Sequence, residues 1–205
     1  MDEKKKSVVK ESLKLPKCWD EKLAFVLHNV LTRQECDEYI RITEEKGYEE
    51  ALLNVGGGRQ ILRADIRNSS RCIWDSTEEV LKLWKRMKKY IPSKWKHRKV
   101  LGLNERLRFL KYDPGEYFKP HFDGQYVRDN GEISYITVLL YLNTGYDGGN
   151  TTFLNFAENE KTEMIPQAGS ALIFEHGIFH EGSLLLDGRK YVMRTDVMYS
   201  ASSDQ

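Results

Sequence analysis

Cysteine is scarce in this sequence: Cys18, Cys36 and Cys72 are the three among 205 residues. They are odd in number, and their spacing matches no zinc or redox motif. The sequence therefore excludes a disulfide framework of the kind on which small secreted domains depend, and it predicts reduced thiols in an intracellular protein. We expect a cytoplasmic location, with the nucleus as an alternative.

Long apolar runs are also missing, since no stretch approaches the roughly 18 residues that a membrane-spanning helix needs. The opening segment, "MDEKKKSVVKESLKLP", is charged and lacks the apolar core of a secretory signal. We predict no membrane segment, a solvated tail over 1–20 and a single domain over 21–205. A chain of this length buries roughly 70% of its unfolded surface, so the domain needs no disulfide or structural metal.

The chain as a whole has no large excess of positive or negative charge, but one segment is strongly basic. The formal net charge is +1, yet nine basic residues and no acidic ones fall between Val80 and Asn104. The ordinary interpretation is a solvated helix face and the loop after it. The alternative is a docking surface over 82–99 for an acidic partner or nucleic acid. Trp84 falls on the apolar stripe of the predicted helix, which favours the ordinary interpretation.

Two helices are predicted in the first half of the chain. Thr32 with a glutamate three residues later has the pattern of a capping box, and Gly47 suits a C-terminal cap. A second helix begins at Ser76, again with a glutamate three residues later, and Pro92 ends it. Its buried stripe is Val80, Leu83, Trp84 and Met87.

From residue 107 onward, short runs rich in β-branched and aromatic residues alternate with turn sequences such as "DPG" and "DGG". Strands that follow one another without helices indicate a sandwich or barrel, and a double-sheet jelly roll fits their number. We predict an α+β chain with a helical support over 21–104 and a jelly-roll (double-stranded β-helix) catalytic half over 105–200. The predicted strands are 107–112, 116–122, 134–142, 150–156, 162–165, 170–175, 178–184 and 190–199.

His121 and Asp123 stand two residues apart in "YDPGEYFKPHFD". On a strand, residues two apart point to the same face, so this imidazole and carboxylate would lie side by side. A third metal ligand must come from elsewhere. His180 is the candidate, and His176 competes with it. Two histidines and a carboxylate on one face of a metal, with the other positions open, suit ferrous iron and oxygen chemistry.

Several motifs occur in a fixed order around these residues. Together they resemble the iron(II)- and 2-oxoglutarate-dependent dioxygenases of the prolyl 4-hydroxylase type, over about residues 107–199. The motifs are Tyr-x-Pro-Gly from Tyr112, His-x-Asp from His121, Tyr-Leu-Asn from Tyr141, Gly-Gly-x-Thr-x-Phe from Gly148, and a distal His180 followed by Gly-x-Lys ending at Lys190.

The resemblance implies that His121, Asp123 and His180 hold the metal, in agreement with the ligand set argued above. The spacing to Gly-x-Lys favours His180 over His176. A carboxylate at position 123 favours hydroxylation, because halogenating relatives have a small residue there. The cofactors implied are Fe(II), 2-oxoglutarate as cosubstrate and O2, with ascorbate as a candidate reductant.

The far carboxylate of 2-oxoglutarate needs a buried cation, which offsets the cost of burying its charge. Lys190 lies ten residues after His180 and matches the spacing of the family. Arg194 is the rival, since strand alternation puts it on the same face and a guanidinium binds a carboxylate with two prongs. Tyr112 and Tyr141 match positions near the oxoglutarate, and core packing is the alternative role for both.

The resemblance makes a peptidyl residue, most simply proline, the leading substrate. The polar segment 124–132 follows two of the ligands and is expected to act as a mobile lid, and Arg67 and Arg71 would help to grip an extended chain. Three alternatives stay open: hydroxylation of a free amino acid or small metabolite, demethylation of a nucleic acid by the same chemistry, and a non-catalytic metal-binding jelly roll.

Overall fold

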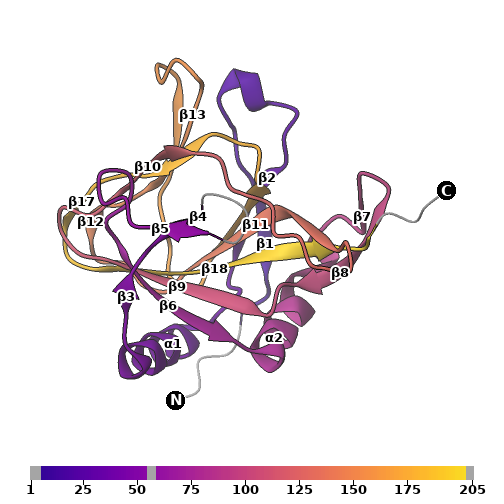
Figure 1. Ribbon diagram of the computed structural model, residues 1–205, viewed down its shortest axis with the longest axis horizontal. Coiled ribbons are helices and arrows are strands. Elements are labelled where there is room, and N and C mark those ends of the chain that lie inside the picture. Colours follow the sequence, from indigo (N-terminus) through magenta and orange to yellow (C-terminus); the bar gives the residue numbers. More distant parts are fainter. Residues whose placement is uncertain (1–5, 55–58, 202–205) are drawn as a thin grey trace.

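Two facing β-sheets form the body of the protein, and two helices cover the outer face of the larger sheet (Figure 1). The computed structural model describes residues 6–54 and 59–201. Part of the glycine-rich segment "NVGGGRQ" lies outside the described residues. No helix within the described ranges is long and apolar enough to cross a membrane.

The larger sheet has ten strands, and every pairing in it is antiparallel. Its strands are β1 (Val9–Ser12), β2 (Ala24–His28), β3 (Glu49–Glu50), β6 (Ser70–Asp75), β7 (Lys94–Trp95), β8 (Arg98–Leu103), β9 (Arg106–Tyr112), β11 (Ile133–Tyr141), β15 (Ala171–Glu175) and β18 (Lys190–Tyr199). Their order is β1-β2-β15-β11-β18-β9-β6-β3, with β8 pairing β18 and β7 pairing β8.

The smaller sheet has four strands in the order β10-β16-β13-β14. They are β10 (Phe118–His121), β13 (Thr151–Leu154), β14 (Lys161–Met164) and β16 (His180–Gly182). Two short pairs complete the strands: β12 (Asp147–Gly148) with β17 (Leu185–Asp187), and β4 (Leu53–Asn54) with β5 (Gln60–Ile61). All eight strands predicted from residue 107 onward are present, and the two sheets form the predicted double-stranded β-helix.

Both predicted helices are present, α1 (Arg33–Lys46) and α2 (Thr77–Met87), with short 3-10 turns η1 (Lys17–Trp19) and η2 (Lys88–Tyr90). Thr32 and Glu35 form the full capping box, and Gly47 is the C-cap at φ 87°. The second cap is only half formed. The Ser76 hydroxyl accepts from the backbone of Glu79, but the Glu79 carboxylate accepts from the Tyr39 hydroxyl of α1 instead.

Strand alternation divides the apolar side chains into two cores. On one face of the larger sheet, residues such as Phe109 and Met193 pack with Leu83 and Met87 of α2. On the other face, residues such as Leu110 pack toward the smaller sheet. The helices therefore stabilise one side of the sheet and leave its other side to face the cavity between the sheets.

One prediction about the first half of the chain is wrong: residues 1–20 are not simply a solvated tail, since β1 pairs with β2 and the side chain of Trp19 is buried. The helical support predicted over 21–104 also contains strands, because β2, β6 and β8 belong to the same sheet as β9, β11 and β18. The boundary near residue 104 therefore does not divide the architecture.

Candidate metal centre and active site

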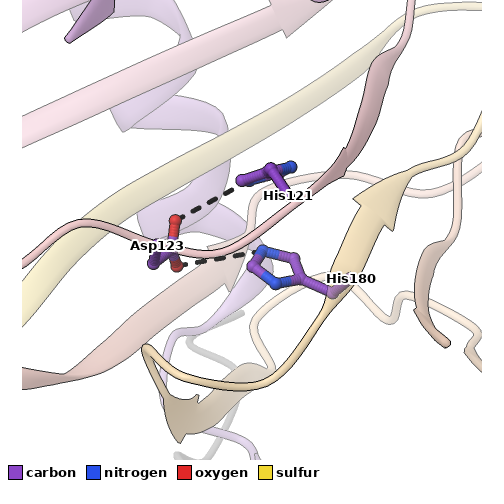
Figure 2. Close-up of side chains that lie close together, drawn as sticks. All are labelled: His121, Asp123 and His180. Carbon is purple, nitrogen blue, oxygen red and sulfur yellow. Dashed lines mark ion pairs between the residues drawn. The ribbon is translucent and has the colours of Figure 1, made fainter. Parts of the chain in front are cut away.

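The side chains of His121, Asp123 and His180 lie close together and point toward one another (Figure 2). His121 ends β10 and is the register partner of His180, which begins β16. Asp123 follows in the loop after β10. Its Oδ1 lies 3.7 Å from His121 Nε2, and its Oδ2 lies 3.8 Å from His180 Nε2. One ligand atom from each residue lies within 4.8 Å of the others, a spacing that a single metal ion can bridge.

Backbone carbonyls fix the orientation of both imidazoles. His121 Nδ1 lies 2.8 Å from the carbonyl of Lys119, and His180 Nδ1 lies 2.9 Å from the carbonyl of Ile178. A carbonyl can only accept, so each Nδ1 carries the proton and each Nε2 presents a lone pair toward the centre. Burial lowers the pKa of His180. Burial and the neighbouring His180 lower the pKa of His121 to about 3. Both rings are therefore neutral near pH 7.

The Asp123 carboxylate is held on both oxygens. The Thr137 hydroxyl donates to Oδ2 at 2.5 Å, and Arg194 Nη1 lies 2.7 Å from Oδ1. Burial alone would raise the pKa of this carboxyl, but the charged guanidinium of Arg194 holds it well below its ordinary value. The group is therefore an anion under all ordinary conditions, as a metal ligand must be.

His176 lies in a hydrogen-bonded chain behind Asp123. The Thr137 hydroxyl donates its only proton to Asp123. Its oxygen must therefore accept a hydrogen bond from His176 Nδ1, at 2.9 Å. The neutral His176 then accepts at Nε2 from the Ser134 hydroxyl, at 2.9 Å. The oxygen of this hydroxyl accepts from the backbone N–H of Tyr126 at 2.8 Å. Both ring nitrogens of His176 are engaged in this way, which favours His180 as the third ligand.

A cavity of about 530 Å³ opens next to the three residues. Alternate residues of β9 and β18 form one of its walls, as strand periodicity requires. These residues are Arg108, Leu110, Tyr112, Lys190, Val192, Arg194 and Asp196.

Lys190 is buried in this cavity, and no carboxylate of the described residues pairs with its ammonium group. Nζ donates to the carbonyl of Gly149 and lies 5.0 Å from the ring centroid of Tyr112 and 5.8 Å from that of Tyr141. Burial lowers the pKa of Lys190 to about 7. A buried ammonium of this kind is suited to an incoming anion.

Arg194 has acidic partners, unlike Lys190. It is the register partner of Arg108 on β9, and two arginines placed opposite each other repel. Asp196 compensates this repulsion, since its Oδ1 lies 3.3 Å from Arg194 Nη2 and its Oδ2 lies 3.0 Å from Arg108 Nη1. Together with its contact to Asp123, this pairing makes Arg194 a support for the ligand rather than a free anion site.

Residues 107–195 match the family model described as the 2OG-Fe(II) oxygenase superfamily. Among curated proteins, the chain is 30% identical over 177 residues to prolyl 4-hydroxylase 5 of Arabidopsis thaliana, and 26% identical over 170 residues to probable prolyl 4-hydroxylase 3 of the same plant. Over residues 107–195 the chain is therefore similar to the 2OG-Fe(II) oxygenase superfamily. Each alignment covers 74% of the chain, which spans 56% and 57% of the lengths of these two relatives.

Solved oxygenase structures share the fold. A viral collagen prolyl hydroxylase from Paramecium Bursaria Chlorella virus-1, in its 2OG complex, has a TM-score of 0.64 at 22% identity, covering 89% of this chain and 98% of that one. A Trichoplax adhaerens prolyl hydroxylase, in complex with a hypoxia inducible factor peptide fragment, has a TM-score of 0.63 at 17% identity, covering 85% and 82%. These likenesses confirm the double-stranded β-helix fold.

The chemistry of the cavity fits the two groups from which the oxygenase superfamily takes its name. Two neutral imidazole nitrogens and a carboxylate form a donor set that ferrous iron accepts. Lys190, a buried cation without an acidic partner, fits the far carboxylate of 2-oxoglutarate. Tyr112 lines the cavity close to Lys190, whereas Tyr141 is fully buried and donates its hydroxyl to Thr151 at 2.7 Å.

Sequence reasoning missed three residues of this candidate site. Thr137 holds Asp123, Asp196 holds two arginines, and Thr151 lies on the cavity wall beside Tyr141. A signal for Thr137 was present, because it is a polar residue within the apolar run 133–143.

The predicted lid, 124–132, contributes to the cavity at its first residues, Gly124 to Tyr126. Beyond them the segment folds back on itself, since Val127 bridges to Ile133. Arg128 forms ion pairs with Glu132 and Glu105. These contacts tie the tip of the segment to the body of the protein, and movement of the lid stays a prediction.

Some basic side chains of the segment 82–99 form ion pairs within the fold. Lys82 pairs with Glu78 and Glu79, and Arg86 pairs with Glu35 of α1. None of the nine basic residues lines the cavity. A docking role for this segment therefore has no connection to the candidate site and stays a prediction.

Proposed function

We propose that this protein is an Fe(II)- and 2-oxoglutarate-dependent dioxygenase that hydroxylates a C–H bond of a peptidyl residue, most simply proline, with release of succinate and CO2. One observation carries the proposal: a His-Asp-His donor set and an unmatched buried lysine face the same cavity. The first suits the metal and the second suits the cosubstrate, and the chemistry needs both together.

His121, Asp123 and His180 would hold the iron. Bound iron and 2-oxoglutarate would supply the oxidising chemistry, with O2, for hydroxylation of a C–H bond. The three residues lie at the edge of the cavity, so substrate and cosubstrate would reach the metal from the cavity. Thr137 and Arg194 keep the Asp123 carboxylate in place by holding one oxygen each.

Lys190 would anchor the far carboxylate of the cosubstrate, at the end of the cavity that Tyr112 and Thr151 also line. Burial makes this anchor strong. The ammonium has no counter-charge before the cosubstrate binds, and it then forms an ion pair in a medium of low polarity. The apolar side chains of Leu110, Leu139 and Val192 exclude water from the cavity wall between anchor and metal.

The relatives support a peptide substrate, since the curated proteins bear the name prolyl 4-hydroxylase and the Trichoplax structure holds a peptide. An extended proline-rich segment loses little conformational entropy on binding. A free amino acid is the competing substrate for the same cavity. Ascorbate would act as a reductant that keeps the iron ferrous.

The test is turnover of 2-oxoglutarate by the purified protein with Fe(II). We expect slow succinate release without substrate, faster release with a peptide library rich in proline, and products that gain one oxygen atom in mass spectrometry. His180→Ala should abolish succinate release, whereas His97→Ala, on the exposed β7–β8 turn, should leave it unchanged. A wild-type protein that binds iron but never forms succinate would sink the proposal and leave a non-catalytic metal-binding jelly roll.

A further inference from the structure

One arginine of the cavity wall has no acidic partner within residues 6–54 and 59–201. Arg67 lines the cavity, and its Nε donates to the buried hydroxyl of Ser69 at 3.0 Å. Its Nη2 is buried and has no hydrogen-bond partner within the described part of the chain. Burial, together with the positive charges of Arg194 and Arg71, lowers the pKa of the Arg67 guanidinium. A buried polar group without a partner is costly, so its retention calls for a ligand.

The other arginines of the wall have acidic partners. Arg71 pairs with Glu49 at 3.0 Å, whereas Arg108 and Arg194 share Asp196. The lack of a partner is therefore a property of Arg67 and not of the wall as a whole.

The proposed metal and cosubstrate do not supply the missing charge. Lys190 would take the far carboxylate of 2-oxoglutarate. The near carboxylate would bind at the metal, which Asp123 would also hold, so neither group is free to pair with Arg67. Arg67 would then still have no anionic contact in the loaded protein, and the substrate is a source of one.

Arg67 lies close enough to the metal centre to contact a substrate that reacts there. Its guanidinium carbon is 4.8 Å from the ring centroid of Phe118, and that ring stacks on His121 with centroids 3.6 Å apart. Only one aromatic side chain therefore separates Arg67 from a proposed iron ligand. Since successive residues of an extended peptide lie about 3.3–3.6 Å apart, a group bound to Arg67 belongs to the target residue or to a near neighbour.

A carboxylate satisfies Arg67 better than a neutral group does. A peptide carbonyl would accept a hydrogen bond from Nη2 but would leave the charge uncompensated beside Arg194 and Arg71. A carboxylate provides both the charge and two acceptors in the planar geometry of the guanidinium.

On the basis of the proposed function, we infer that the preferred substrate carries a carboxylate next to the hydroxylated residue and that Arg67 binds this carboxylate. The group is either an acidic side chain beside the target proline or the free carboxylate of a small amino acid. Arg67 is thus a specificity-determining residue that selects acidic substrates.

The experiment compares matched ligands by anaerobic titration calorimetry on the protein loaded with Fe(II) and 2-oxoglutarate. The probes are acetyl-Ala-Pro-Glu-Ala-amide and acetyl-Ala-Glu-Pro-Ala-amide, each against its glutamine counterpart, and L-proline against L-prolinamide. We expect an acidic probe to bind at least about tenfold more tightly than its neutral counterpart. A preference confined to the peptides identifies an acidic side chain as the source, and one confined to L-proline identifies a free amino acid.

Arg67→Met should erase this preference, and Arg63→Met should keep it, because Arg63 lies on the same turn but is exposed and pairs with Asp65. Equal binding of every acidic and neutral pair by the wild-type protein would overturn the inference, and this comparison needs no variant to fold. A raised KM for 2-oxoglutarate in Arg67→Met, with the acidic preference intact, would also overturn it and assign Arg67 to the cosubstrate. Calorimetry does not depend on turnover, so a failure of the proposed function is seen separately, as a lack of succinate.

Discussion

Lys190 and Arg194 lie on the same face of β18 and line the same cavity, but among the described residues only Arg194 has acidic partners. Arg194 contacts Asp123 and Asp196, whereas Lys190 donates to a backbone carbonyl and remains without a counter-charge. This difference favours separate roles for the two cations, with Arg194 supporting the proposed metal ligand Asp123 and Lys190 binding an anion. Lys190 therefore stays our proposed anchor, in preference to Arg194.

We expect Lys190→Ala to raise the KM for 2-oxoglutarate strongly while leaving metal affinity almost unchanged. Breaking a buried ion pair costs about 3–5 kcal/mol, which is more than about a hundredfold in affinity. Arg194→Ala should have the opposite signature, with weakened metal binding. Steady-state succinate release and metal titration measure the two effects. Arg189→Ala is the matched control, since this neighbour points outward to Asp113. A normal KM in Lys190→Ala would rule out Lys190 as the anchor.

The KM for 2-oxoglutarate should rise with pH above about 7. Burial lowers the pKa of Lys190 to about 7, so above this pH the cosubstrate must bind together with a proton. The KM then rises by up to about tenfold per pH unit, and stability rises over the same window because the unfolded chain binds more protons there. Lys190→Arg, which stays charged, should flatten the profile. Succinate assays from about pH 6 to about pH 9 test this, and an equally steep profile in Lys190→Arg would contradict the assignment.

His176→Ala should weaken metal binding without abolishing turnover. His176 acts through Thr137 on Asp123 and not on the metal, and the loss of such an outer partner typically costs about 10–100-fold in metal affinity. Activity should therefore return at high iron concentration, which His180→Ala cannot achieve. Thr137→Val keeps the side-chain shape but removes the donor to Asp123, so it should reproduce the effect. Complete loss of activity in His176→Ala at saturating iron would point to His176 as a ligand.

Much of the site was predictable because strand periodicity is simple. The alternation of Lys190 and Arg194 along β18 follows from a repeat of two residues. Asp123 was expected on the strand of His121 but lies in the loop after it, so its approach to His121 does not come from this repeat. The register between strands is not encoded in such a repeat. The sequence therefore could not show that Arg194 stands opposite Arg108, or that Asp196 pairs with both.

The first half of the chain was harder to predict for a related reason. The side chains of β1 are all exposed, so this strand has no apolar alternation, and it forms through backbone pairing with β2. Trp19 is buried because its ring contacts Phe156 and its indole nitrogen donates to Leu154, both distant in sequence. Capping residues, by contrast, act within one turn, and Thr32 correctly predicted the start of α1.

The packing of α2 against the larger sheet gives a prediction about stability that is separate from activity. Leu83 is 1% exposed and packs in the core between helix and sheet, whereas Leu81, two residues earlier, is 55% exposed. Leu83→Ala should lower the free energy of unfolding by about 2–5 kcal/mol, because it removes apolar contacts and leaves a cavity.

Leu81→Ala is the matched control, since both variants replace a leucine of α2 with alanine. Its free energy of unfolding should stay within about 0.5 kcal/mol of the wild type, because Leu81 is exposed. Urea unfolding at equilibrium measures both variants. Lys190 faces the opposite side of the sheet from α2, so the KM for 2-oxoglutarate should be normal in Leu83→Ala wherever the variant remains folded. Equal losses of stability in the two variants would mean that α2 does not pack on the sheet through its Leu83 face.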